Sequence, residues 1–243
     1  MHCLFGNANA QPKKSETITG YLEVVFRNMV NDKPLVLFDS AYTNPFGESY
    51  TLSKFKYYIS NTTLNTAFRS FTADNDYHLI DQNIDSSLHF IIQCPVGEFD
   101  AIQFLLGVDS ARNISGAQTD ALDPINDMFW TWNSGYVMEK LEGNSPQSDV
   151  VNNKFEYHIG GYDGPNSVLN YLRIVFPADK KLIITNGKKC TVIFDVQVND
   201  FWNAETDIKI KQTPVCTQPG ALAKQIAGNF SKLFHLAEVI NNK

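Results

Sequence analysis

Residues 121–143 read ALDPINDMFWTWNSGYVMEKLEG and contain two of the chain's three tryptophans and two of its four methionines. The segment is too aromatic for an ordinary loop and too rich in Asn, Gly and Ser for an ordinary core. If the chain is extended from Met128, alternate side chains share a face, which places Met128, Trp130 and Trp132 together. Two indoles on one pleated face indicate a slab of core or the wall of a site, and aromatic stripes usually indicate core packing.

On both sides of this segment, apolar runs of strand length alternate with turn residues. Within residues 50–64, Phe55, Tyr57 and Ile59 face one way and two lysines face the other. Further strands are expected at residues 88–94, 101–108, 154–159, 171–176, 181–185 and 191–198. Strands that recur about every ten residues predict a mainly β protein, a single-domain β-sandwich of antiparallel strands.

The C-terminal part has a different period. After Pro219 and Gly220, apolar residues recur at helical spacing, at Leu222, Ile226, Phe230, Leu233 and Ala237. This pattern predicts one amphipathic helix that packs against the sandwich. The sequence shows no internal repeat and no change of composition that would suggest a second domain.

Composition and charge exclude several classes of protein. The chain has 243 residues, of which 43% are hydrophobic and 19% charged, with a net charge of −6 and a pI of about 5.3. An acidic chain without a basic face is not expected to bind nucleic acid. No apolar run approaches the ~20 residues that span a bilayer, so we expect a soluble monomer without membrane insertion.

The N-terminus resembles the end of an export signal. Ala8, Asn9, Ala10 and Gln11 fit the small-x-small rule for signal cleavage, although a charged n-region is missing. We therefore interpret residues 1–16 as the remnant of a signal peptide with a disordered N-terminus, and residues 17–243 as the folded domain. The expected location is the periplasm, the cell surface or the medium, as a secreted protein.

The four cysteines are Cys3, Cys94, Cys190 and Cys216, and none forms a CxxC pair. The spacing excludes a zinc ribbon and a thioredoxin-type motif. Cys190 and Cys216 could form a disulfide in an oxidising compartment, or the thiols could be separate and buried.

No catalytic motif is present: the chain lacks HExxH, a P-loop, a GxGxxG behind a strand and GxSxG, so no enzyme activity is expected. One histidine has an informative context. In residues 155–161, FEYHIGG, the apolar Phe155, Tyr157 and Ile159 share one face and His158 lies on the other, ahead of a Gly-Gly pair. His158 is thus a candidate metal ligand, although a lone histidine is more often structural.

A cluster of polar residues precedes the aromatic stretch. Asp109, Asn113 and Asp123 supply oxygen ligands of the kind that calcium prefers. The run lacks the DxDxDG pattern, so the calcium hypothesis competes with a simple polar loop.

The order of these pieces resembles a known family. FLLGVDSARN (104–113), ALDP (121–124), MFWTWNSGY (128–136), KLEG (140–143) and FEYHIGG (155–161) occur in the order typical of the copper-binding MbnP-like family, which includes methanobactin-associated proteins and surface copper proteins of methanotrophs. AYTNPFGESYTLSKFKYYISNTTL (41–64) and KQIAGNFSKLF (224–234) are similar to its first half and its C-terminal segment. The resemblance spans Thr17 to about Ile240, and the MFWTWNSGY block is its most specific part.

The resemblance implies a copper site. The first tryptophan of the W-x-W pair, here Trp130, is the residue that the family can oxidise to kynurenine, whose amine joins two histidines around Cu(I). One of these histidines corresponds to position 132, where this chain has Trp132, and the other to His158. The ligand set of the family is therefore incomplete here, and Trp132 and Met128, which share a face with Trp130, are further candidates for the copper site. Members are exported and work beside a di-haem MauG-like peroxidase, which modifies the tryptophan.

Two functions from different classes follow. The first is an exported copper-binding protein for copper acquisition or buffering, with Trp130 and His158 at the site. The alternative is a non-metal envelope β-sandwich whose aromatic face recognises carbohydrate or protein, because exposed tryptophan beside Asn, Glu and Tyr also forms sugar-binding platforms.

Overall fold

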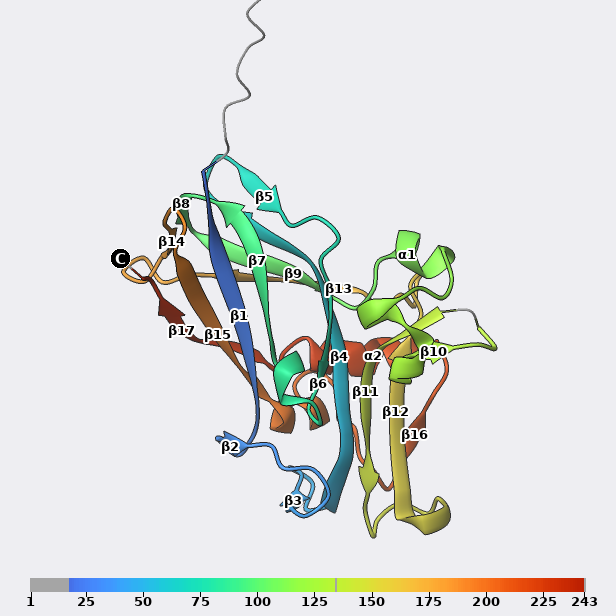
Figure 1. The fold of residues 1–243 in the computed structure, drawn as a ribbon. Coiled ribbons are helices and arrows are strands. Elements are labelled where there is room, and N and C mark those ends of the chain that lie inside the picture. Colours follow the sequence, from blue (N-terminus) through green and yellow to red (C-terminus); the bar gives the residue numbers. More distant parts are fainter. Residues whose placement is uncertain (1–17, 134, 243) are drawn as a thin grey trace, which may run out of the picture.

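Two curled sheets enclose one core in the computed structural model, which describes residues 18–133 and 135–242 (Figure 1). The mainly β fold expected from the alternation of apolar residues is confirmed, and it is consistent with a β-sandwich. The export-signal interpretation of residues 1–16 concerns residues outside the described ranges.

The smaller of the two main sheets has five strands in the described ranges and is built on β1 (Thr19–Val30). β1 pairs antiparallel with β7 (His89–Pro95) along one edge and parallel with β15 (Lys189–Gln197) along the other. β17 (Phe234–Ile240) extends the sheet beyond β15, and β2 (Lys33–Pro34) pairs with the end of β1. Every second residue of β1, β7 and β15 is buried, as expected for strands with one face on the core.

The larger sheet is built on the long strand β4, which pairs with β9 and β6 in one part and with β11 in another. β11 in turn pairs with β10 and β12. The strands of this sheet in the described ranges are β3 (Ala41–Thr43), β4 (Ser49–Asn65), β5 (Ser70–Thr72), β6 (Tyr77–Asp81), β9 (Ala101–Leu106), β10 (Phe129–Trp130), β11 (Gly135–Asn144), β12 (Lys154–Gly160), β13 (Asn170–Val175) and β16 (Val215–Cys216).

Short elements complete the fold. β8 (Gly97–Phe99) and β14 (Leu182–Ile184) form a small separate sheet. The helical elements are α1 (Ser110–Ile114), α2 (Ala221–Phe230) and the 3-10 turns η1 (Asp85–Ser87), η2 (Asp120–Leu122), η3 (Pro124–Asn126), η4 (Val151–Asn153) and η5 (Val198–Trp202). Over the described ranges, no helix has both the length and the hydropathy to span a bilayer.

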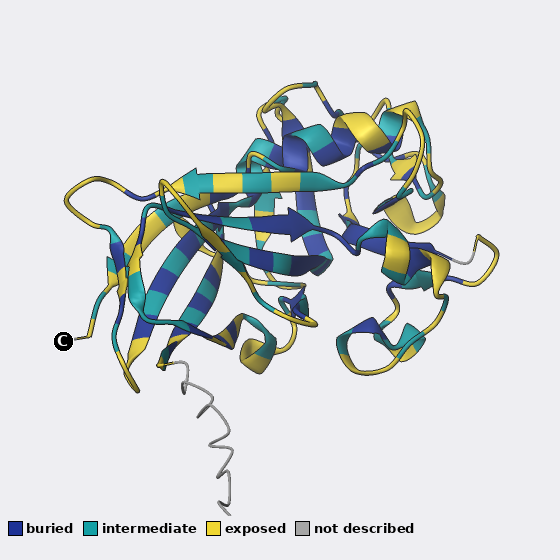
Figure 2. Cartoon of the chain, turned by 90° about the horizontal axis from the view of Figure 1, so that it is seen from above, coloured by how far each residue is buried: buried dark blue, intermediate teal, exposed yellow. Residues whose placement is uncertain are grey.

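Aromatic side chains fill the space between the sheets. Phe26 of β1 stacks on Phe194 of β15 with ring centroids 5.7 Å apart, and it meets Phe104 and Phe234 edge-on. These contacts join β1, β9, β15 and β17 into one hydrophobic cluster. The alternation of buried and exposed residues along the strands is visible in Figure 2.

Two details of the sequence-based fold are wrong. The strands are not all antiparallel, because β1 pairs parallel with β15 and β12 pairs parallel with β16. The C-terminal helix is also shorter than its apolar spacing suggests: α2 ends at Phe230, and Ala237 lies in β17. Residues 234–240 pair with β15, and this tertiary pairing outweighs the local helical period.

Residues 109–130, here called the covering segment, fold over the face of β4 and β11 that points away from the core. Tyr58 of β4 donates its hydroxyl to the carbonyl of Ala121 at 2.9 Å, and Lys140 Nζ of β11 donates to the carbonyl of Asp127. Both faces of β11 are therefore covered, and Lys140 is only 2% exposed. This cover determines where the aromatic residues of the segment lie.

Candidate metal centre

A short hairpin places Trp130. Trp130 pairs with Gly135 and Phe129 with Tyr136 in the β10–β11 ladder. Trp130 is 7% exposed and Trp132 is 62% exposed, while their ring centroids are 5.3 Å apart. One indole of the pair is thus packed inside, and the other covers it from the solvent side.

Gly160 of β12 makes room for the buried indole. A Cβ at Gly160 would lie 2.6 Å from Cζ3 of Trp130 and 2.8 Å from Cη2, closer than any real contact. Gly160 lies two residues after His158 on the same strand, so the two positions share a face. The structure therefore brings Trp130 and His158 to the same face of the same sheet.

His158 is held by an acidic partner on the neighbouring strand. Its Nε2 lies 2.8 Å from Oε1 of Glu142, and Phe155 and Tyr157 are buried on the opposite face of β12, as the alternation predicted. Burial opposes ionisation of Glu142, but the hydrogen bond with His158 and the charge of Lys54 outweigh it and lower the pKa of Glu142. The carboxylate is therefore ionised at neutral pH.

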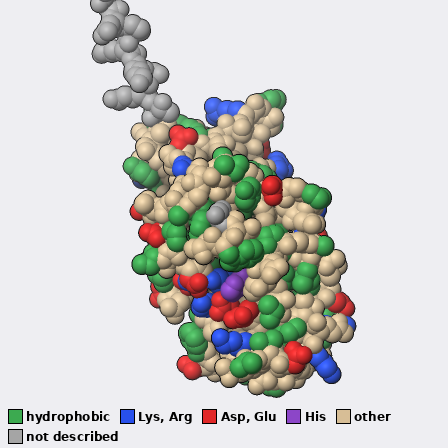
Figure 3. All heavy atoms as spheres, turned by 90° about the vertical axis from the view of Figure 1, so that its right-hand side faces the viewer, with side chains coloured by type: hydrophobic (Ala, Val, Ile, Leu, Met, Phe, Trp, Pro, Cys, Tyr) green, Lys and Arg blue, Asp and Glu red, His purple; other side chains and the backbone are tan. Residues whose placement is uncertain are grey.

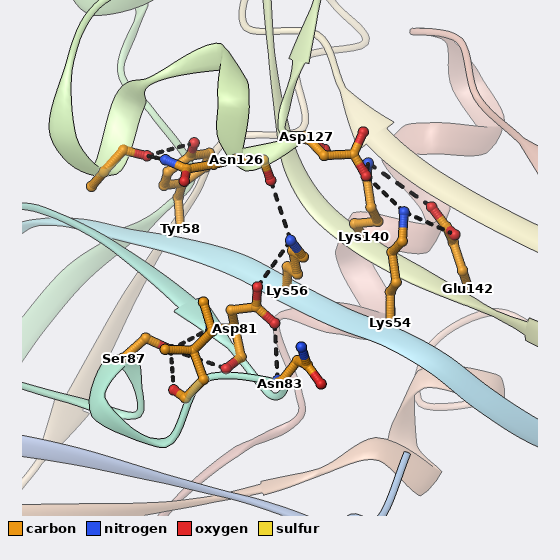
Figure 4. A network of polar contacts seen from close by, with 12 residues as sticks. Lys54, Lys56, Tyr58, Asp81, Asn83, Ser87, Asn126, Asp127, Lys140 and Glu142 are labelled. Atoms are coloured by element: carbon orange, nitrogen blue, oxygen red, sulfur yellow. Dashed lines mark hydrogen bonds and ion pairs between the residues drawn. The ribbon is translucent and has the colours of Figure 1, made fainter. Parts of the chain in front are cut away.

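Two lysines and an aspartate complete the polar network (Figure 4). Asp127 Oδ2 lies 2.7 Å from Lys54 Nζ and 3.0 Å from Lys140 Nζ. Burial acts to raise the pKa of Asp127, but the hydrogen bonds from Lys54 and Lys140 lower it to about 2. Burial also lowers the pKa of Lys140, although Asp127 offsets part of this effect. Figure 3, which looks onto the side that carries β10 and β12, shows a histidine among acidic and basic side chains beneath a hydrophobic patch.

Met128 belongs to the core. Its side chain is fully buried in the main hydrophobic cluster, and its carbonyl accepts a hydrogen bond from the amide of Val137 at 2.9 Å. The regular pairing of β10 covers only Phe129 and Trp130. The extended segment inferred from Met128 onward is thus shorter than the sequence suggested.

The carboxylates proposed for calcium cap helical turns. Asp109 accepts a hydrogen bond from the amide of Arg112 at 3.1 Å and another from the hydroxyl of Tyr77. Asp123 accepts from the amide of Ile125 at 2.9 Å. The bonds from Arg112 and Ile125 each satisfy an amide in the first turn of α1 or η3, which explains why an acidic residue precedes each of these elements. The calcium hypothesis stays a prediction.

Asn113, the third residue of that hypothesis, connects α1 to the aromatic hairpin. Its side chain is 1% exposed, and its Oδ1 accepts from the amide of Tyr136 at 2.9 Å. Its Nδ2 donates to the carbonyl of Asp109 at 3.0 Å. Asn113 therefore fixes the start of β11 and, through it, the position of Trp130.

Within the described ranges, no three His, Cys, Asp or Glu side chains converge in an arrangement that could hold a metal ion. The partner of His158 was missed by the sequence interpretation, because Glu142 lies 16 positions away and only the β11–β12 register brings the two together. The KLEG motif could have indicated this partner, since it contains two charged residues, Lys140 and Glu142, in the strand before His158.

The buried-thiol alternative for the cysteines is confirmed, since Cys94, Cys190 and Cys216 are all free and buried. Burial raises the pKa of Cys94 to about 12 and also raises that of Cys216.

Comparison with known proteins agrees with the order of motifs. The sequence matches the MbnP family profile over residues 19–218, which is most of the chain. This chain belongs to the MbnP family. No curated protein matches the sequence.

The MbnP fold is also found by structural comparison. MbnP from Methylosinus trichosporium superposes with a TM-score of 0.54 at 14% sequence identity, covering 84% of this chain and 82% of the other. At this identity the likeness establishes the fold alone. The MbnP match includes Trp130, Glu142 and His158 and ends before α2.

Proposed function

We propose that this MbnP-family chain is an exported copper-binding protein that acquires or buffers copper, with Trp130 and His158 at the site. The observation that carries the proposal is the packing of the Trp130 indole on Gly160, on the His158 face of β12. Copper is the cargo of the protein in this proposal, and the chain has no catalytic role.

The donors support copper on one condition. The His158 imidazole is a good ligand for copper, whereas the nitrogen lone pair of an indole belongs to the ring system and is a poor donor. Two equivalents of hydrogen peroxide add two oxygen atoms across the C2–C3 bond of the Trp130 indole, which opens the five-membered ring and gives N-formylkynurenine. Hydrolysis then releases C2 as formate and leaves kynurenine, with an aryl amine and a ketone. The modified residue then supplies the second nitrogen donor, while Trp132 occupies the position where a histidine is expected.

A di-haem MauG-like peroxidase is the proposed partner, which catalyses this oxidation with hydrogen peroxide as the oxidant. Trp130 is 7% exposed, whereas Trp132 is 62% exposed and its ring centroid is 5.3 Å from that of Trp130. An electron can therefore leave Trp130 through Trp132, which an external haem protein can approach. The periplasm or the cell surface is the proposed location of this encounter.

Two measurements test the copper proposal. The first is peptide mass mapping of protein from its native host, which should show kynurenine at Trp130 and unmodified Trp132. The second is Cu(I) competition titration of His158→Ala beside His235→Ala, whose exposed imidazole pairs with Asp200 in a comparable way. Weakened binding in the first variant alone supports the proposal, whereas equal binding in both removes His158 from the site.

An aromatic binding face remains the alternative because Trp132 is exposed over the packed Trp130. In that case the protein recognises carbohydrate or protein without metal. Unmodified Trp130, absence of copper from the purified protein and loss of glycan or protein binding in Trp132→Ala would favour this alternative.

A further inference from the structure

A groove follows the edge of β7 that does not pair with β1. Its volume is about 750 Å³, within the range of roughly 300–1,000 Å³ that ligand sites occupy. β7 forms one wall from Ile91 to Pro95, and the β5–β6 segment forms the other from Phe71 to His78. The groove therefore lies where the smaller sheet ends and the larger sheet begins.

The backbone of β7 is available for pairing in this groove. In an antiparallel pair, every second residue turns its amide and carbonyl toward the neighbouring strand. The bond from Val96 N to Ile18 O fixes which residues these are: in β7 they are Phe90, Ile92 and Cys94, which face β1. The amides and carbonyls of Ile91 and Gln93 turn to the opposite edge. Within the described ranges no backbone group bonds to them.

The opposite wall carries two aspartates, of which Asp76 is buried and Asp74 is exposed. Asp76, whose side chain is 1% exposed, accepts from the amide of Thr62 at 2.7 Å and lies 2.5 Å from His78 Nε2. His78 stacks on Phe90 with ring centroids 3.7 Å apart. Asp74 is exposed beside them, and among the residues that the structure describes no lysine or arginine lines the groove.

We propose that this groove binds an extended peptide segment of a partner protein, which adds as a strand to β7 and carries a lysine or arginine toward the exposed Asp74. Main-chain bonds to Ile91 and Gln93 supply affinity, as in other cases of strand addition, and the acidic wall selects the basic side chain. Residues 91–95 offer a track of about 16 Å, enough for a segment of about five residues.

The proposal is independent of copper. β7 belongs to the smaller sheet, whereas Trp130 and His158 belong to the larger one. A failure of peptide binding therefore leaves the copper proposal untouched, and the reverse also holds.

The test is a binding titration by NMR with an acetylated TVKVTV peptide amide and a library of alternating basic hexapeptides. Gln93→Pro removes the outward amide without removing a bond to β1, because proline is tolerated where a strand edge is unpaired. Gln93→Ala is the matched control, since both variants lose the 2.6 Å bond from Gln93 Nε2 to Thr19 Oγ1 but only the proline loses the amide.

We expect binding to the wild-type protein, at least about tenfold weaker binding to Gln93→Pro, and at most about a twofold change in Gln93→Ala. Asp74→Asn should reduce the preference for the peptide with lysine over its counterpart with glutamate. Unchanged unfolding midpoints of the variants would show that each is folded.

Three outcomes would overturn the proposal. The first is no binding of the probe or of any library member to the wild-type protein. The second is equal binding to the proline and alanine variants. The third is self-association of the free protein that Gln93→Pro abolishes, which would make a second copy of β7 the occupant.

Discussion

Trp130 and Gly160 are matched in shape: the outer carbons of the indole fill the space above the glycine, where a Cβ would come within 2.6 Å of Cζ3. The contact joins the covering segment to β12 and fixes the indole next to the strand that carries His158. A glycine at this position is a requirement of packing, because the backbone of Tyr136 is also 2.8 Å from the same point.

The first prediction is that Gly160→Ala displaces the indole. The added methyl group meets both Trp130 and the backbone, so the free energy of unfolding should fall by about 1–3 kcal/mol. Urea unfolding and the tryptophan emission spectrum measure the effect. Gly135→Ala is the control in the same hairpin, because its nearest atoms lie 3.7 Å away. Equal losses in both variants would contradict the packing argument.

The second prediction concerns Glu139, a carboxyl group that is 1% exposed and lacks a hydrogen-bond partner in the described ranges. Burial raises its pKa well above the usual value, which favours the protonated carboxyl group in the folded protein. The contribution of this raised pKa to the free energy of unfolding is complete below pH ~4, and it is lost as the pH rises through the pKa of folded Glu139.

Glu139→Gln should therefore show a flatter dependence of unfolding free energy on pH between 5 and 8 than the wild-type protein. Glu139→Met, which removes the unpaired polar group, should be more stable at pH 8 by about 1–3 kcal/mol. Parallel pH profiles of the wild-type protein and Glu139→Gln would exclude a titrating core carboxyl.

The third prediction concerns Asp127, whose pKa is lowered to about 2 because Lys54 and Lys140 outweigh its burial. The Asp127 carboxylate contributes to the free energy of unfolding above pH ~4, the pKa of an aspartate in the unfolded chain. This contribution is lost as the pH falls toward 2. Asp127→Asn should cost at most about 1 kcal/mol at neutral pH, because the carboxylate is 57% exposed. Its acid unfolding between pH 4 and 2 should be less steep than that of the wild-type protein. An unchanged acid profile would show that the lysines do not stabilise the charge.

The fourth prediction separates the two indoles of the pair. Trp130→Ala removes a packed side chain and should lower the free energy of unfolding by about 3–5 kcal/mol, whereas Trp132→Ala should change it by less than about 1 kcal/mol. Acrylamide quenching should likewise act mainly on Trp132. Similar stability of both variants would contradict the assigned burial.

The fifth prediction concerns the three described thiols. All three thiols are buried, and burial also raises the pKa of Cys94 to about 12 and raises that of Cys216. Native protein should therefore react with Ellman's reagent much more slowly than unfolded protein at Cys94, Cys190 and Cys216. Labelling followed by peptide mapping measures each site. Rapid labelling of Cys94 under native conditions would show that the edge of β7 opens.

Much of the fold could be predicted from period alone. The alternation in residues 154–159 placed Phe155 and Tyr157 on the core and His158 on the other face, and β12 has that arrangement. The periodicity of apolar residues predicts the wrong element where pairing with a distant strand determines the structure. Residues 234–240 continue a helical spacing but pair with β15 as a strand. The parallel pairing of β1 with β15 could not be predicted either, because the sequence of neither strand indicates the direction of its partner.

The candidate site could be predicted less completely. The aromatic pair and His158 follow from their motifs, whereas Glu142 becomes a partner of His158 only through the register of β11 and β12. The different exposure of Trp130 and Trp132 depends on how the covering segment folds back, which strand alternation does not describe. The positions of Asp109 and Asp123 are explained by capping, because their carboxylate oxygens accept hydrogen bonds from backbone amides of α1 and η3.

The position of β1 has a consequence for biosynthesis. Thr19 at its start bonds Gln93, 74 positions later, and Arg27 near its end bonds Asp195, 168 positions later. A ribosome thus produces β1 long before β15, the only strand in the described ranges that pairs with its second edge, exists, and such distant pairing is slow. During that interval β1 presents an unpaired apolar edge that invites aggregation. Fragments that stop before β15 should therefore accumulate as insoluble material, while the complete chain closes this edge itself.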